Sequence, residues 1–143
     1  MAEQHYKNHA RLVPLYHYVL LPILLTSLVG AGVNMYRSFH NGGSRLASVI
    51  ILLLTISLIV TAFFARIFAL KAQDRAIRVE QQFRYYIMTG KPMPSLRISQ
   101  IIALRFASDE EFVALCQRAS EEKIKSKEIK KQIKKWKGDL YRV

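Results

Sequence analysis

Residues 46–65 read LASVIILLLTISLIVTAFFA, a run of twenty residues without a charge between Arg45 and Arg66. At about 1.5 Å of rise per residue, a helix of this length crosses roughly the 30 Å hydrocarbon core of a bilayer. A helix also satisfies its backbone hydrogen bonds internally, as lipid requires. The run therefore predicts a transmembrane helix. No Gly or Pro follows before Gly90, so the same helix is expected to continue into the cytoplasm to about residue 89.

A second apolar run, from Leu12 to Tyr36, has 25 residues without a formal charge and predicts another span. A secretory signal is the alternative, with residues 30–32 as a small-residue cleavage site, but its apolar core would be only ~7–15 residues long. Pro22 is expected to bend this span. Thr26 and Gly30, four residues apart, form a small-residue patch where another helix can approach closely.

The two runs are joined by residues 37–45, RSFHNGGSR, with Asn-Gly-Gly as the turn signal. Two long helices joined so briefly are expected to be antiparallel neighbours, which gives a transmembrane hairpin. Basic residues near the span ends number two in the connection against seven on the other side. This asymmetry predicts that both termini are cytoplasmic. The seven are Lys7, Arg11, Arg66, Lys71, Arg75, Arg78 and Arg84.

The expected cytoplasmic extension carries a seam of apolar and small residues at alternating spacings of three and four, as in a coiled coil. A helix is expected to pack along it, either from the C-terminal part of this chain or from another subunit. Glu80 and Arg84, four residues apart, are expected to pair across the exposed side. The seam consists of Ala69, Ala72, Ala76, Val79, Phe83 and Tyr86.

The Gly- and Pro-containing segment 90–95 is expected to end the long helix. It divides the chain into residues 1–90, with spans at about 12–36 and 46–65, and a basic helical tail of residues 91–143. Three short helices are expected in the tail. The first has an apolar side made by Ile98, Ile101 and Ile102, and the second follows a capping box at residues 108–111. Phe112, Leu115, Cys116 and Ala119 are expected to line the buried face of the second.

The third tail helix, expected from Ser126 to Lys137, is amphipathic. Its apolar stripe is formed by Ile129, Ile133, Trp136 and Leu140, and its basic face by Lys127, Lys130, Lys131, Lys134 and Lys135. Such a helix can lie on an anionic membrane surface, bind RNA phosphates or face solvent. So small a tail makes a poor core alone and is expected to lean on the long helix, the membrane or a partner.

The net charge of +12 arises largely after residue 65, where residues 66–143 hold 18 basic and 9 acidic side chains. This excess favours anionic partners, namely lipid head groups, RNA or acidic proteins. No catalytic, nucleotide-binding or metal-binding motif is present, so no enzyme activity and no cofactor are predicted. His5 and His9 are four residues apart, but the second span has no His or Cys to complete a metal or haem site. His17 is the one titratable residue that a span could contain.

Four stretches carry a resemblance that covers nearly the whole chain: YKNHARLVPLYH, ARIFALKAQDRAIR, LRFASDEEFVAL and KEIKKQIKKW. Together they resemble a bacterial family of small, uncharacterised two-span membrane proteins. The resemblance implies a multi-pass protein of the bacterial inner membrane and brings no activity or site residues.

The sequence therefore predicts an all-α membrane protein with a two-helix hairpin, an extended second helix and short C-terminal helices. The favoured function is that of a non-enzymatic accessory or structural subunit of a larger inner-membrane complex, in contact with lipids and other subunits. One alternative is a membrane tether whose basic tail binds the ribosome, other RNA or anionic lipid. Another is a component of an oligomeric transporter that uses His17.

Overall fold

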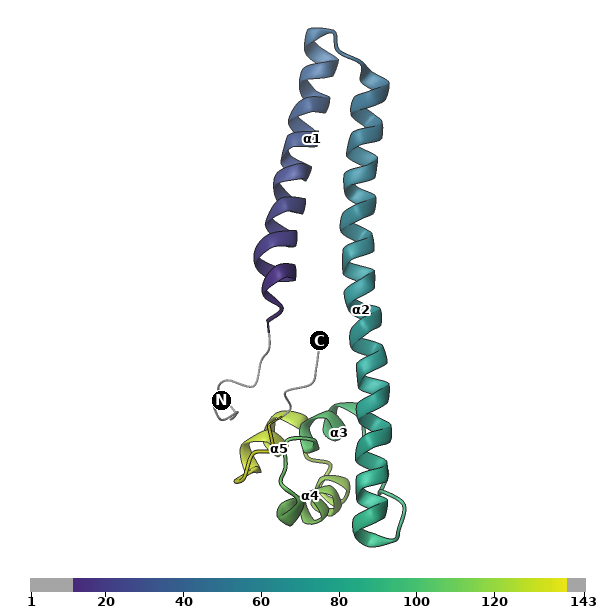
Figure 1. Cartoon of the computed structure of the whole chain (residues 1–143), viewed down its shortest axis with the longest axis vertical. Helices are drawn as coiled ribbons and strands as arrows, with labels where there is room; N and C mark the ends of the chain where they lie inside the picture. Colours follow the sequence, from purple (N-terminus) through teal and green to yellow (C-terminus); the bar gives the residue numbers. More distant parts are fainter. Residues whose placement is uncertain (1–11, 139–143) are drawn as a thin grey trace. The chain divides into compact units, whose positions relative to one another are not determined.

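The computed structural model describes residues 12–138, and its regular elements are helical (Figure 1). A short π-helix, η1 (Leu15–Leu20), leads into α1 (Leu21–Asn41). The long helix α2 spans Arg45–Thr89. Three short helices follow, namely α3 (Ile98–Leu104), α4 (Asp109–Glu121) and α5 (Ser126–Gln132).

Contacts between residues divide the described chain into two compact units, residues 12–69 and residues 70–138. We call them the apolar unit and the basic unit. The division falls about twenty residues before the expected boundary at residue 90. The last turns of α2 are the reason, because Tyr85 belongs to the core of the basic unit. Helix α2 thus contributes to both units.

The first helix of the apolar unit changes its bonding pattern near Pro22. The Leu21 N–H donates to the carbonyl oxygen of Tyr16, five residues back, as in a π-helix. Pro22 has no N–H to donate to the preceding turn, and α-helical bonding follows. The helix ends at Asn41, where Gly42 adopts a φ of +82°, a left-handed conformation that favours glycine. The connection is therefore only residues 42–44, shorter than the expected nine.

Two polar contacts join the helices of the apolar unit. The Tyr16 hydroxyl donates to the Ala62 carbonyl at 3.2 Å, and the Asn34 amide donates to the Ser48 hydroxyl at 3.4 Å. The buried positions recur every seven residues, which places them on one side of each helix. They are Leu24, Ala31 and Ser38 in α1 and Ser48 and Thr55 in α2.

Large apolar side chains cover the outer surface of the apolar unit. Leu25, Val29, Leu54 and Leu58 are all about 60% exposed, an arrangement suited to lipid rather than water. The helical stretch Leu15–Asn41 and α2 are each long and apolar enough to cross a membrane.

The basic unit has an ordinary buried core. Helix α4 contributes the face expected from its sequence, with Phe112, Leu115, Cys116 and Ala119 all buried. Helix α3 adds Ala103 and Leu104, and α2 adds Tyr85. The short helices therefore lean on the end of α2, one of the three supports that the sequence allowed.

The third tail helix was expected to reach Lys137, but α5 ends at Gln132 because Ile133 is extended. The chain then pairs with the segment before α4. Lys137 N–H donates to the Phe106 carbonyl at 2.7 Å, and the Ser108 N–H donates to the Lys135 carbonyl at 3.1 Å. Residues 133–137 therefore form a non-helical strap, and Leu140 lies outside the described residues.

The expected capping box at the start of α4 is also wrong. Ser108 is the N-cap residue, but its side chain makes no capping hydrogen bond. The Glu111 carboxylate instead accepts hydrogen bonds from the backbone N–H groups of Lys134 and Lys135, at 3.2 and 3.0 Å. The acidic side chain thus holds the strap rather than its own helix end.

Candidate interaction surfaces

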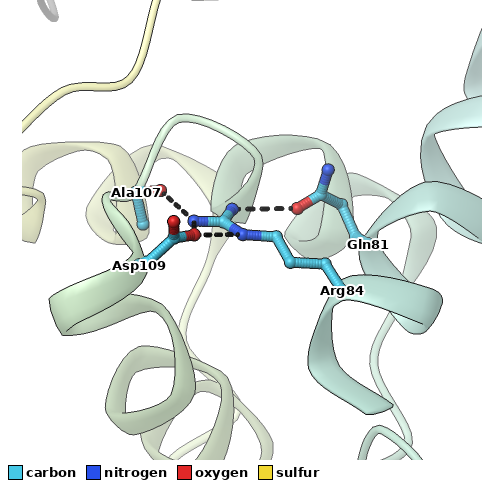
Figure 2. Close-up of polar contacts among 4 residues, drawn as sticks. All are labelled: Gln81, Arg84, Ala107 and Asp109. Atoms are coloured by element: carbon cyan, nitrogen blue, oxygen red, sulfur yellow. Dashed lines mark hydrogen bonds and ion pairs between the residues drawn. The ribbon is translucent and has the colours of Figure 1, made fainter. Parts of the chain in front are cut away.

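Arg84 joins α2 to the segment that begins α4 (Figure 2). Its Nε donates to Asp109 Oδ1 at 2.8 Å, and its Nη2 donates to the Ala107 carbonyl at 2.8 Å. Its Nη1 donates to the Gln81 side chain, and the guanidinium lies 4.0 Å from the centre of the Phe112 ring. Together these bonds satisfy the donors of a largely buried guanidinium. The hydrogen bond from Arg84 to Asp109, together with the charge of Arg84, lowers the pKa of the Asp109 carboxyl. Arg84 therefore fixes the angle at which α4 meets α2.

The sequence assigned Arg84 a different role. Glu80 at helical spacing suggested a surface pair, but the carboxylate that Arg84 contacts belongs to Asp109, twenty-five residues away. The expected Glu80–Arg84 pair is not formed. Helical spacing reveals neighbours on one helix, whereas a contact between two helices depends on how they pack.

The opposite side of α2 carries an exposed apolar ridge, which we define as Val79, Phe83, Tyr86 and Ile87. Their side chains are 66, 63, 55 and 66% exposed. At 100° per residue these four positions lie within about a quarter of the helix circumference. Soluble surfaces rarely leave so many large apolar side chains side by side.

The tail covers another face of α2, which consists of Ile77, Gln81 and Tyr85. These residues are buried at steps of four along the helix, and the Tyr85 ring lies 6.3 Å from that of Phe112. The interpretation that the seam docks on the chain's own C-terminal helices is therefore wrong for Val79, Phe83 and Tyr86. Ala72 and Ala76 are exposed as well, while Ala69 is half-buried.

The described residues of the apolar stripe pack in or against the core of the basic unit. Ile129 and Ile133 are buried, and the Trp136 ring lies 5.0 Å from that of Phe106. On the other side Lys127, Lys131, Lys134 and Lys135 are exposed, and Lys130 is half-buried with its ammonium 5.6 Å from the Phe106 ring. Lys135 forms an ion pair with Glu110, which raises the pKa of Lys135. The lysines of the basic face therefore lie on the outside of a protein core, and the apolar residues beneath them contact that core rather than lipid.

Thr26 and Gly30 face away from the second helix of the apolar unit. Both are exposed, and the Thr26 hydroxyl donates to the carbonyls of Pro22 and Ile23 in its own helix. No atom lies within 4 Å of a Cβ built on Gly30. The buried face of α1 carries Ala31 instead, and no described residue packs on the expected patch at Gly30.

A family model, described as a family of unknown function (DUF6526), matches residues 1–143. The chain belongs to this family. No curated protein and no solved structure matches it. The family agrees with the resemblance to an uncharacterised family and assigns no chemistry to any residue. The function of the surfaces described above therefore has to be inferred from their exposure, charge and contacts.

Among the described residues, Cys116 and His17 are the side chains whose surroundings bear on reactivity. Cys116 is fully buried, and burial raises the pKa of its thiol to about 12, so its nucleophilic thiolate is scarce at neutral pH. His17 Nδ1 lies 2.9 Å from the Val13 carbonyl oxygen. Within residues 12–138 no three His, Cys, Asp or Glu residues cluster as metal ligands would. His5 and His9 lie outside the described residues.

Proposed function

We propose that the chain is a non-enzymatic accessory subunit of a larger protein complex in the bacterial inner membrane. The observation that carries this proposal is the exposed apolar ridge of the basic unit. It lies on α2, the helix that also contains the more apolar candidate span. An apolar surface at this place is suited to a partner that is itself held at the membrane.

The spacing of the ridge favours a helix as the contacting element of the partner. Val79, Phe83 and Tyr86 follow one another at steps of four and three, the spacing of knobs in coiled-coil packing, and Ile87 lies beside them. Ala72 and Ala76 precede the ridge on the same face and leave room for the partner backbone to approach. The tail already occupies the other face of α2, so the ridge is open to a second protein.

Copurification tests this proposal. The tagged full-length chain is extracted in mild detergent, and the proteins retained by Phe83→Ser and Gln82→Ser are compared. Both positions are exposed on α2, but only Phe83 belongs to the ridge. We expect Phe83→Ser to lose most of a defined set of membrane proteins, because apolar anchors dominate interface energy, and Gln82→Ser to retain them.

Ala76→Leu provides a second variant that preserves helix propensity. A larger side chain at this point should hold a partner helix away at a cost of about 1–3 kcal/mol, as overfilled contacts do. If Ala76→Leu and Phe83→Ser both copurify like the wild type, the ridge faces solvent and the proposal is wrong.

The proposed topology places both apolar helices across the membrane as a hairpin, with both termini in the cytoplasm. The basic-residue asymmetry supports it. Asn41→Cys and Glu121→Cys are exposed labelling sites in a Cys116→Ser background. We expect an impermeant maleimide to label Asn41→Cys and not Glu121→Cys in intact spheroplasts. The reverse pattern would invert the orientation, and labelling of both would contradict the hairpin.

A membrane tether for RNA, most naturally the ribosome, is the second candidate. The observation that favours it is that four of the five lysines of the basic face are exposed, while Ile129 and Ile133 of the apolar stripe are buried. Phosphate contacts need the lysines and not the stripe. Ribosome binding to vesicles carrying the full chain would support the tether if it fell steeply with salt and weakened in Lys131→Gln/Lys134→Gln. Absence of ribosome binding at low salt would eliminate it.

A further inference from the structure

The basic unit contains a cavity of about 630 Å³ between the segment that leads into α3, the end of α4 and the beginning of α5. Four cationic residues line it, namely Arg97, Lys123, Lys125 and Lys127, and all four are exposed to solvent at its open side. Four serines also line it, and no carboxylate does among the described residues. The lining therefore combines positive charge with hydroxyl donors.

Gln100 builds the inner wall of this cavity. Its side chain is buried, and its amide group donates to the carbonyls of Ala119 at 3.0 Å and Ile124 at 2.8 Å. Its Oε1 accepts the N–H of Arg97 at 2.8 Å. One side chain thus connects all three walls. It also occupies two carbonyl oxygens that would otherwise repel an anion.

The cations around the cavity lack acidic partners within the described residues. None of the four forms an ion pair with a carboxylate in residues 12–138. Other cations of the same unit do have acidic partners, as Arg84 has Asp109 and Lys135 has Glu110. Lys123 has a φ of +50°, a conformation that residues other than glycine adopt rarely. Such departures often accompany binding sites.

We propose that this cavity binds the phosphate groups of a small molecule. Phosphate matches the lining because Arg and Lys donate strong charge-assisted hydrogen bonds to it, while serine hydroxyls add neutral ones. The volume lies within the range of roughly 300–1,000 Å³ typical of small-molecule sites. Leu96 and Ile124 supply an apolar wall for the remainder of the ligand. The phosphate belongs either to a soluble phosphorylated molecule or to a phospholipid head group. This inference is independent of the proposed partner.

The test uses the full chain in phosphatidylcholine nanodiscs, with sodium pyrophosphate as the calorimetric probe. Lys125→Gln/Lys127→Gln removes two cavity charges, and Lys91→Gln/Lys134→Gln removes two exposed charges of the same unit outside the cavity. We expect the cavity variant to bind pyrophosphate at least about tenfold more weakly, because it loses charge-assisted bonds, and the control to change less than about twofold. Sulfate at matched ionic strength controls for general screening.

Native mass spectrometry with added phosphatidic acid distinguishes the two sources of phosphate. Retention of phosphatidic acid over phosphatidylcholine, lost in Lys125→Gln/Lys127→Gln alone, assigns the site to a lipid head group. Pyrophosphate binding with equal lipid retention in wild type and cavity variant assigns it to a soluble molecule. The proposal is overturned if neither ligand binds or if both double variants weaken binding equally. Preferential binding of poly(U) RNA, weakened equally by both variants, would likewise replace the cavity with a diffuse basic surface.

Discussion

The two units bury opposite kinds of side chain. In the apolar unit the buried positions are Leu24 and four small residues, Ala31, Ser38, Ser48 and Thr55, while most leucines and valines face outward. In the basic unit Phe106, Phe112, Ile101 and Ile129 are buried, and most charged residues are exposed. Burial of apolar surface is favourable in water but gains little in lipid. Helices in lipid therefore associate through small residues that pack closely. The contrast agrees with the two helices of the apolar unit being long and apolar enough to cross a membrane.

The apolar ridge is the exception within the basic unit. Its side chains are exposed like those of the apolar unit, although Arg75, Arg78 and Glu80 are exposed on the same helix. A helix segment that exposes charged side chains is not surrounded by lipid, so lipid does not cover the apolar ridge. The comparison therefore supports a protein partner at this place, and the variants below test the difference between the two units.

The largest effect is expected from Phe112→Ala in the basic unit. Phe112 is fully buried and contacts both Tyr85 and Arg84, so its removal should destabilise this unit by about 3–5 kcal/mol. Limited proteolysis in detergent should then cut within residues 91–138 while the apolar unit remains protected.

Phe83→Ala is the matched control for Phe112→Ala. The residue type and replacement are the same, but Phe83 is exposed on the ridge, so stability should change by no more than about 0.5 kcal/mol. Equal proteolysis of both variants would mean that the ridge is structurally covered, which would contradict the contrast between the two faces of α2.

A smaller effect is expected inside the apolar unit from Ala31→Leu. Ala31 is buried between the helices, and the added side chain should cost about 1–3 kcal/mol through overpacking. Ser27→Leu introduces the same side chain at an exposed position of α1 and should be tolerated. Thermal unfolding in detergent measures the difference. If Ala31→Leu were as stable as Ser27→Leu, the small-residue packing of this unit would be wrong.

The features predicted best from the sequence depend on local pattern. Charge-free length gave two helices apolar enough to span a membrane, and the glycines at 42 and 43 marked the turn. Spacing alone identified the buried face of α4. The Thr26–Gly30 patch did not identify the face of α1 that is buried. Several small residues lie along α1, and the sequence does not say which of them faces the second helix.

Features that depend on tertiary contacts were predicted poorly. The Ile129, Ile133 and Trp136 spacing fits a longer helix, but pairing with residues 106–108 draws the chain out of the helix after Gln132. Trp136 then packs on Phe106 in the core. A Trp136→Ala change would therefore destabilise the basic unit itself and could not distinguish lipid from RNA binding. The cavity could not be predicted from the sequence either, because Arg97 and Lys123 are far apart along the chain.

The smallest expected effect concerns the pH dependence of the basic unit. Contact with Arg84 lowers the pKa of the Asp109 carboxyl from its ordinary value of 3.8. A carboxyl whose pKa is lowered on folding stabilises the fold fully above its unfolded pKa, and the contribution is lost as the pH falls through the folded pKa. Asp109 is largely exposed, so solvent screening limits the contribution to about 1 kcal/mol.

Asp109→Asn should therefore lower the unfolding temperature of the basic unit at pH 7, and the difference from the wild type should shrink as the pH falls below 3.8. Asp74→Asn, the same change in α2 rather than α4, should show little difference at either pH, because Asp74 has no ion pair among residues 12–138. A constant difference between Asp109→Asn and wild type across this range would mean that the Asp109 charge is not what Arg84 uses. Its remaining bonds to Ala107 and Gln81 would then be sufficient to hold α4 against α2.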